Sequence, residues 1–208
     1  YLTYFGITAH HVPTAAAAAE FLDGHGADLL LLDVGLPDGS GFDLCRRIRA
    51  ESDLPILFVS ARAGDDDEIL GLTVGGDDYI RKPYSLGVLP AKVRRVLERC
   101  TAPMPDAAAF DDGHLRVDPT ADRVFVDGVE VVLPALEHRL LLFLVGNRGR
   151  VLTKTELFQQ VWGDTFIGDG TLTVHISRLR TRIEPDPERP AYIRTVWGRG
   201  YLFEDRAG

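Results

Sequence analysis

Short runs of apolar residues divide the first half of the chain in a way that is typical of buried β-strands. They lie at residues 29–32, 56–59 and 79–80. The segments around these runs carry apolar residues at helical spacing: Phe42, Cys45, Ile48, Ile69, Leu72, Val93, Val96 and Leu97. Strands that alternate with helices predict a parallel sheet covered by helices. The first half is therefore predicted to be an α/β domain with a parallel sheet.

The second half predicts a different order: three short strands, three helices and a terminal hairpin. The strands are expected at residues 115–117, 123–126 and 129–133, and the hairpin at 193–203. The helices are expected at residues 135–147, from Thr153 onward, and at 171–184. Asp127-Gly128 is typical of a hairpin turn, and Thr153 with Glu156 is typical of a capping box. The second half is therefore predicted to be an α+β domain.

A change of composition separates the two halves. Residues 101–112 contain two prolines and mostly small or acidic residues, without a periodic pattern. We therefore predict a first domain at residues 1–100, a linker at 101–108 and a second domain at 109–208.

Composition and charge narrow the class of protein. Apolar residues make up 45% of the 208 residues and charged residues 26%, which is typical of a globular protein with a core. No apolar stretch approaches the roughly 20 residues that cross a bilayer, and no leader sequence precedes the first domain, so we expect a cytoplasmic protein without membrane contact. The formal charge is −8. Most of this acidity lies in the first half, so the charge does not exclude DNA binding by the second.

Three polar residues follow the three predicted strands of the first half. Asp33 directly follows the run at 29–32, Ser60 directly follows the run at 56–59, and Lys82 lies two residues after the run at 79–80. The carboxyl ends of parallel strands meet at one rim, so these side chains are expected to converge there. A carboxylate can attack a phosphoryl group, while a hydroxyl and an ammonium can bind its oxygens. Taken singly, each residue is as well explained as a turn, loop or surface residue.

The first half resembles the receiver domains of two-component response regulators. The matching residues are Asp33, Pro37, Asp38, Gly39, Gly41, Ser60, Ala61, Gly75, Asp77, Asp78, Tyr79, Lys82 and Pro83. The resemblance implies a flavodoxin-like sheet in which Asp33 accepts a phosphoryl group from a sensor histidine kinase. It also implies that Lys82 and Ser60 contact this group, that Tyr79 is the switch residue and that Lys82-Pro83 is a cis peptide.

The sequence departs from the receiver pattern at two places. Receivers begin with a strand that ends in an acidic pair, which holds Mg²⁺ together with the phosphorylated aspartate. The chain as given starts at Tyr1, near the expected second strand, so we expect an N-terminally truncated receiver in which only Asp33 and the Gly35 carbonyl remain as Mg²⁺ ligands. The resemblance implies a homodimer through the receiver. Asp77, Asp78, Lys92 and Arg95 keep part of its charge pattern, whereas Glu68, Val88 and Pro90 depart from it.

The predicted helix at 171–184 has the pattern of a DNA-reading helix. Its apolar residues form one narrow stripe: Leu172, Ile176, Leu179 and Ile183. The other faces are polar or basic, without an acidic residue between Gly170 and Glu184, which favours contact with a polyanion. An ordinary solvated surface explains the same charges equally well.

The second half as a whole resembles the winged-helix domain of OmpR/PhoB-type response regulators. The resemblance implies that the helix at 171–184 enters the major groove of promoter DNA, at tandem half-sites, and that the hairpin reaches the minor groove. The implied contact residues are Trp162, Thr171, Ser177, Arg178, Arg180, Thr195, Trp197, Arg199 and Tyr201. Trp197 stands where relatives usually have arginine. Residues 163–170 match a loop that touches RNA polymerase in relatives.

These observations predict a transcriptional regulator, not an enzyme, whose DNA binding is controlled by phosphorylation of Asp33. A regulator of the same fold that is controlled by a ligand or by abundance is the first alternative. An aspartate-nucleophile phosphatase is the second, but such enzymes have a second aspartate two residues after the nucleophile, where this chain has Gly35.

Overall fold

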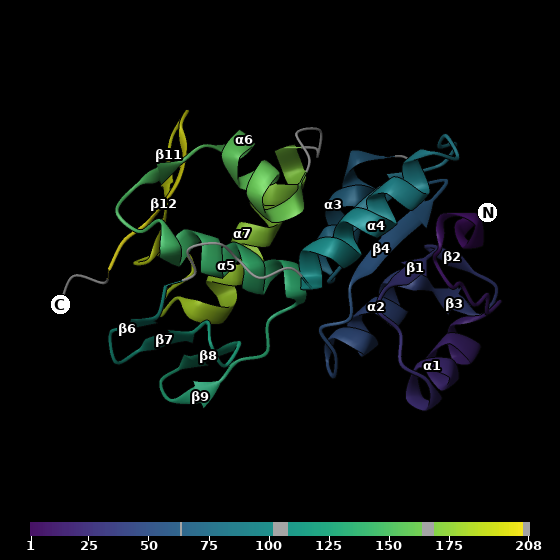
Figure 1. Cartoon of the computed structure of the whole chain (residues 1–208), viewed down its shortest axis with the longest axis horizontal. Coiled ribbons are helices and arrows are strands. Elements are labelled where there is room, and N and C mark those ends of the chain that lie inside the picture. Colours follow the sequence, from purple (N-terminus) through teal and green to yellow (C-terminus); the bar gives the residue numbers. More distant parts are fainter. Residues whose placement is uncertain (63, 102–107, 164–168, 206–208) are drawn as a thin grey trace. The chain divides into compact units, whose positions relative to one another are not determined.

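The computed structural model describes residues 1–62, 64–101, 108–163 and 169–205, without the side chains of 99–101 and 169. The chain divides into two compact units, Tyr1–Glu98 and Arg99–Gly208, each with its own hydrophobic core (Figure 1). Most of the predicted linker, residues 102–107, lies outside the described residues. None of the helices described is long and apolar enough to span a bilayer.

The first unit is built on a parallel sheet with the strand order β1-β4-β5. The three strands are β1 (Leu30–Leu32), β4 (Ile56–Ser60) and β5 (Asp78–Arg81), and every residue of β4 is buried. A small hairpin, β2 (Gly35–Leu36) and β3 (Gly39–Ser40), follows β1. The helices are η1 (Leu2–Phe5), α1 (Ala15–Gly24), α2 (Gly41–Arg49), α3 (Asp65–Thr73) and α4 (Val88–Thr101). All three predicted strands are confirmed, while α1, β2 and β3 were not predicted.

The expected second strand of the receiver does not form. Residues 7–13 have no regular structure, and β1 pairs only with β4 in the described part of the chain. In the expected strand order a further strand separates this segment from β1. Without such a strand among the described residues, the backbone of residues 7–13 has no neighbour with which to form a ladder. The prediction of a strand near the start was therefore wrong for this structure.

Helix α4 accommodates the two residues that are unfavourable inside helices. It begins at Val88, so Gly87 precedes it and Pro90 falls in its first turn. The first N–H groups of a helix have no partner within it, so proline is tolerated there.

The described residues of the second unit form two antiparallel sheets and three helical segments. The first sheet has the order β6-β7-β8-β9 and the second the order β10-β12-β11, and Figure 1 shows them apart from each other. The first sheet comprises β6 (Phe110–Asp111), β7 (Leu115–Asp118), β8 (Arg123–Val126) and β9 (Val129–Glu130). The second comprises β10 (Val151–Leu152), β11 (Ile193–Val196) and β12 (Gly200–Phe203). The helices are α5 (Ala135–Gly146), α6 (Lys154–Leu157), which continues as the π-helix η2 (Phe158–Trp162), and α7 (Asp169–Ile183).

Local sequence signals explain the turns and caps of this unit. Asp127 and Gly128 both have positive φ, 50° and 78°, as the tight turn between β8 and β9 requires. Thr153 and Glu156 form the predicted capping box at the start of α6. The predicted order of strands, helices and terminal hairpin is confirmed, while β6 and β10 were not predicted.

Candidate phosphoacceptor site and nucleic-acid interface

Asp33 and Lys82 meet at the carboxyl ends of β1 and β5. The Lys82 Nζ atom donates a hydrogen bond to Asp33 Oδ2 at 2.6 Å, although 49 residues separate them in the sequence. The two side chains, Lys82 and Asp33, are 39% and 38% exposed, so the pair is open to solvent on one side. The predicted convergence of these two residues is therefore observed, and a phosphoryl donor in solvent can approach them.

The backbone around Asp33 is fixed by a close approach at Gly41. A Cβ atom at this position would lie 2.1 Å from the Asp33 carbonyl oxygen, so only glycine fits. The Gly41 N–H also donates to the Val34 carbonyl at 2.9 Å. Ser40 then caps α2 by accepting the Phe42 N–H. These contacts hold the loop that presents Asp33.

The environment of Asp33 keeps its carboxylate ionised. Partial burial alone would raise the pKa of this carboxyl, but the Lys82 ammonium and the Gly35 N–H, which donates to Oδ1 at 3.1 Å, together hold the pKa below its usual value. Asp33 is therefore fully deprotonated at neutral pH, as a nucleophile must be.

Ser60 and Tyr79 lie on the neighbouring strands β4 and β5. Ser60 is buried, its Oγ accepts the Arg62 N–H at 3.1 Å, and its carbonyl accepts the Lys82 N–H at 2.8 Å. The Tyr79 ring is buried against Phe58, and its hydroxyl donates to the Arg62 carbonyl at 2.8 Å. Burial raises the pKa of the Tyr79 hydroxyl, although Ser60 acts in the opposite direction. Ser60 and Tyr79 are thus linked through their hydrogen bonds to the backbone of Arg62, in the loop after β4.

The remaining predicted residues of this site lie beside Asp33 and Lys82. The Lys82-Pro83 peptide is cis, as expected, and Pro83 is exposed. Sequence reasoning missed a role for Asp38, whose carboxylate accepts the N–H groups of Ala15 and Ala16 at 2.8 and 3.0 Å. Asp38 thereby caps the first turn of α1, which was itself not predicted.

Asp33 and the Gly35 carbonyl provide only a minimal oxygen set for a metal ion. Among the described residues there is no group of three or more His, Cys, Asp or Glu side chains that could hold one. Mg²⁺ is usually held by one or two carboxylates, with phosphate and water supplying further oxygens. The half-exposed Asp33 carboxylate, with the Gly35 carbonyl, fits this minimum only when a phosphoryl group contributes oxygens as well.

Ion pairs join α3, β5 and α4 into one face of the first unit. Arg81 on β5 pairs with Asp65 and Glu68 of α3 at 2.6 and 2.7 Å. Lys92 of α4 pairs with Asp78 at 2.6 Å. The helices α3 and α4 and the loop before α4 also carry exposed apolar residues: Ile69, Leu70, Leu86 and Val88. We call this surface the α3-β5-α4 face.

Asp77 does not belong to that face, contrary to the expectation from its charge. Its side chain is only 1% exposed and pairs with Arg49 at 2.7 Å. It also accepts the Ile56 N–H at 2.7 Å, at the start of β4. Asp77 therefore stabilises the interior of the unit and cannot reach a partner protein.

In the second unit, a buried glutamate organises one side of α7. Glu137 of α5 is fully buried, and its Oε1 lies 2.5 Å from Arg178 Nη2. Its Oε2 lies 3.4 Å from Arg182 Nε, and its Oε1 also lies 3.8 Å from Nδ1 of the buried His175. Burial raises the pKa of Glu137, but His175, Arg178 and Arg182 more than offset this and lower it overall. The sequence signal was an acid within a leucine-rich helix, but its role was not predicted.

Arg180 connects α7 to the terminal hairpin. Its Nε and Nη2 atoms donate to the Ile193 carbonyl at 2.9 and 2.6 Å, and Nη2 also donates to Thr195 Oγ1 at 3.0 Å. Partial burial lowers the pKa of this guanidinium. The helix and the first strand of the hairpin are thus held together by one side chain.

The predicted DNA-contact residues fall into three groups in the structure. Trp162, Thr171 and Tyr201 are buried, with exposed fractions of 4%, 1% and 5%. Arg178 and Arg180 are partly buried and engaged as described above. The exposed residues are Ser177, Thr195, Trp197 and Arg199. The exposed group lies on α7 and on the hairpin, where it can meet a ligand.

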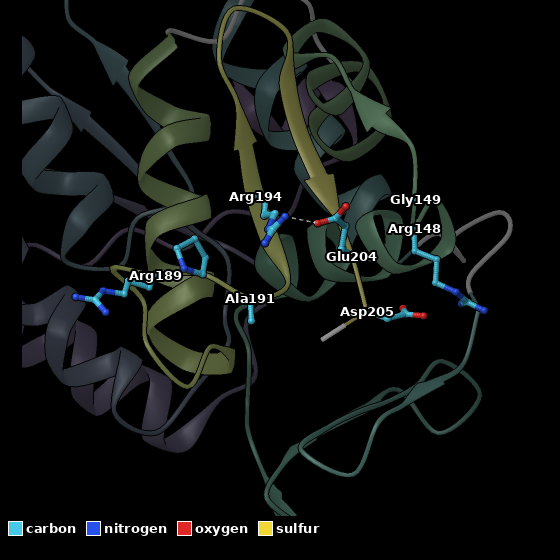
Figure 2. Close-up of a pocket in the computed structure, with 8 residues that line it drawn as sticks. Arg148, Gly149, Arg189, Ala191, Arg194, Glu204 and Asp205 are labelled. Atoms are coloured by element: carbon cyan, nitrogen blue, oxygen red, sulfur yellow. Dashed lines mark ion pairs between the residues drawn. The ribbon is translucent and has the colours of Figure 1, made fainter. Parts of the chain in front are cut away.

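A pocket of about 730 Å³ lies elsewhere in the second unit, at the base of the hairpin (Figure 2). Figure 2 shows Arg148 and Arg189 pointing away from each other, while Arg194 pairs with Glu204 at 2.9 Å. The pocket is lined by Arg148, Gly149, Arg189, Pro190, Ala191, Arg194, Glu204 and Asp205. None of the predicted site residues lines it, and its arginines do not converge on a common ligand.

Comparison with known proteins agrees with both units. Residues 1–94 match the family described as response regulator receiver domain, and residues 128–203 match the family described as transcriptional regulatory protein, C terminal. The chain is 45% identical over 193 residues to the sensory transduction protein RegX3 of Mycobacterium tuberculosis, covering 91% of this chain and 84% of RegX3. The chain belongs to the OmpR/PhoB-type response regulators.

Two solved structures are similar to this chain. The Thermotoga maritima OmpR/PhoB homolog DrrB is 37% identical, covering 90% of this chain and 84% of DrrB, with a TM-score of 0.43. A mutant of the protein RitR has a TM-score of 0.72 at 23% identity, covering 92% and 85% of the two chains, and therefore shares the fold. The two family matches and the similarity to RegX3 together identify this chain as a DNA-binding response regulator of a two-component system. Regulators of this type are phosphorylated by a histidine kinase, and receiver domains generally use Mg²⁺.

Proposed function

We propose that Asp33 is the residue of this regulator that accepts the phosphoryl group. One Asp33 carboxylate oxygen attacks the phosphorus of a phosphohistidine on a sensor kinase. The P–O bond of an acyl phosphate forms while the P–N bond breaks, and the imidazole leaves and takes a proton from solvent. The observation that supports this role is the 2.6 Å contact between Asp33 Oδ2 and Lys82 Nζ at the rim of the sheet.

The neighbouring residues stabilise the phosphorylated state. The Lys82 ammonium neutralises charge on a phosphoryl oxygen, and the Ser60 hydroxyl donates to another. Ser60 then exchanges its present partners for the phosphoryl group, which changes the surroundings of Tyr79. Mg²⁺ bound by Asp33 and the Gly35 carbonyl would neutralise further phosphoryl charge. The changed surroundings of Tyr79 therefore couple phosphorylation to the α3-β5-α4 face.

Phosphorylation controls a homodimer through the α3-β5-α4 face. Its exposed apolar residues gain by burial against a second copy, because apolar surface removed from water stabilises association. Glu68 and Arg81 are already paired within one chain, so the apolar residues rather than these charges provide the contact. Arg95 adds charge on α4.

A phosphate analogue tests this coupling directly. Beryllofluoride added to the full chain is expected to raise the dimer fraction in sedimentation and the affinity for DNA with tandem half-sites, since dimerisation places two binding units on one duplex. Beryllium or fluoride alone serves as the control. An unchanged dimer fraction and unchanged DNA affinity would reject the phospho-switch.

The second unit reads promoter DNA with α7 in the major groove and the β11-β12 hairpin in the adjacent minor groove. Ser177, Thr195, Trp197 and Arg199 are the exposed contact residues. Arg178 meets the duplex only through the small part of its side chain that Glu137 leaves accessible. Trp162, Thr171 and Tyr201 position these elements from within the core. RNA polymerase is the proposed further partner, through residues 163–170, of which 164–168 lie outside the described residues.

Arg180→Ala is expected to weaken promoter binding by about 1–3 kcal/mol. Its loss removes three hydrogen bonds between α7 and the hairpin, so both elements lose their fixed spacing. Fluorescence anisotropy at fixed salt measures the effect. Arg189→Ala, which removes an equal charge from an exposed site outside α7 and the hairpin, is the matched control. Equal affinity of the two variants would contradict the assignment of α7.

A further inference from the structure

The tip of the β11-β12 hairpin presents the most exposed large apolar side chain of the described residues. Trp197 is 90% exposed, and no core cluster includes it. A three-residue loop, Trp197-Gly198-Arg199, joins β11 to β12, closed by the Arg199 N–H donating to the Val196 carbonyl at 2.9 Å. Gly198 has a φ of 70°, which permits this tight turn. The Trp197 indole on this short loop is exposed to water and gains apolar contact when a ligand covers it.

The stem below this tip is held rigidly on both sides. Arg180 bonds the Ile193 carbonyl and Thr195 on β11. On β12, the Gly200 backbone approaches β10 so closely that a Cβ atom there would lie 1.9 Å from the Leu152 carbonyl oxygen. Because both strands are anchored, the indole is presented in a defined place relative to α7, and little chain entropy is lost when it binds.

The chemistry around Trp197 favours a duplex groove over an apolar protein surface. Thr195 and Arg199, both exposed, flank it with a hydroxyl and a cation. A minor groove offers sugar and base surfaces to an apolar ring, acceptor atoms on A·T pairs to the indole N–H, and phosphates to the arginine. Apolar side chains that enter this groove separate base steps and make the duplex bend.

Resting on the proposed DNA binding by α7 and the hairpin, we propose that Trp197 enters the minor groove as an apolar wedge at a base step. It contributes affinity that does not depend on salt and favours deformable pyrimidine–purine steps, because these unstack most easily. Arg199 acts differently, since it contacts a phosphate and displaces counterions. Trp197 is therefore a specificity-determining residue for the sequence and deformability of the DNA site.

Tryptophan fluorescence of the full chain tests whether the indole is covered. The chain has two tryptophans, and Trp162 is buried, so acrylamide quenching in the free protein reports mainly on Trp197. The probe is a duplex selected from a random-sequence pool with the full chain. We expect saturating duplex to shift the emission to shorter wavelength and to reduce quenching severalfold, and Trp197→Phe to abolish both changes. Unchanged quenching with bound duplex would overturn the proposal.

Measurements of affinity and of its salt dependence distinguish the role of Trp197 from that of Arg199. Trp197→Ala is expected to weaken binding about tenfold at every salt concentration, as stacked aromatic side chains do. Arg199→Ala is expected to reduce the slope of log K against log salt by about one. A 2-aminopurine base at the wedge step should brighten on binding of the native chain and not with Trp197→Ala. Circular dichroism checks that the exposed substitutions leave the fold intact.

Other outcomes are decisive in the opposite direction. Native affinity of Trp197→Ala, with or without loss of transcription in vitro, would show that the indole does not bind DNA. Tight binding of the native chain with Trp197 still exposed would reject this inference and leave the proposed function standing. Failure of the native chain to bind any selected duplex would reject both.

Discussion

Asp33→Asn is expected to abolish phosphoryl uptake from acetyl phosphate and from a phosphorylated kinase. The amide keeps the size of the side chain and can still accept the Lys82 hydrogen bond, but it cannot attack phosphorus to form an acyl phosphate. The stoichiometry of incorporated label, measured by intact-protein mass spectrometry, should fall from near one to background. The dimerisation and DNA-affinity gains seen with phosphate donors should disappear with it.

Asp43→Asn is the matched control for this substitution. Asp43 lies on α2 close in sequence to Asp33, and its exposed carboxylate pairs only with the exposed Arg46 among the contacts described. Its replacement should leave label incorporation unchanged. Full labelling of Asp33→Asn would transfer the acceptor role to another residue, whereas loss of labelling in both variants would indicate damage to the receiver fold.

Glu137→Gln is expected to destabilise the second unit by about 3–5 kcal/mol, because removal of one partner leaves buried guanidinium charges uncompensated. Glu137 and His175 are fully buried, and Arg178 is only 11% exposed. For a unit of this size, the melting temperature should fall by roughly 10 °C or more. Urea denaturation gives the free energy of unfolding, with the variant curve displaced to lower midpoint at unchanged slope.

Glu130→Gln is the matched control, because Glu130 pairs with Arg123 at the exposed edge of β8 and β9. It should leave the midpoint nearly unchanged.

The pH dependence of the stability of the second unit gives a second readout of the role of Glu137. The folded-state pKa of Glu137 is lowered, so its stabilisation is complete above the usual glutamate pKa of about 4.3 and is lost as the pH falls through the lower folded value. A Glu137→Gln midpoint equal to the native one at neutral pH would contradict the structural role.

The rim of the first sheet could be predicted from sequence because each polar residue ends a run of apolar residues. Such runs define buried strands, and parallel strands bring their ends together without further information. Asp33 and Lys82 meet for this reason. The strand expected near residues 7–13 could not be judged in the same way, since a strand needs a neighbour and the pattern of one segment does not reveal whether a neighbour is present.

The face of α7 was harder to predict, because its arginines depend on partners far away in the sequence. The apolar stripe correctly indicated which side is buried. Whether Arg178 faces solvent or a buried acid depends on Glu137, 41 positions earlier, and whether Arg180 is available depends on the hairpin. Propensity and periodicity describe a helix but not the ion pairs and hydrogen bonds that it makes with distant parts of the same chain. They therefore do not reveal that Arg178 and Arg180, for which the family resemblance implies DNA contact, also make structural contacts within the unit.

The hydrogen bonds from Arg180 to β11 have a consequence for the arrangement of bases that this regulator accepts. In the binding mode proposed above, α7 and the hairpin are joined in this way and contact the duplex at a fixed separation. One base pair inserted between their footprints turns one footprint about 35° around the helix axis relative to the other. Helix α7 and the hairpin cannot follow that rotation independently. The spacing between the two footprints is therefore itself a feature of the DNA site that this binding mode recognises.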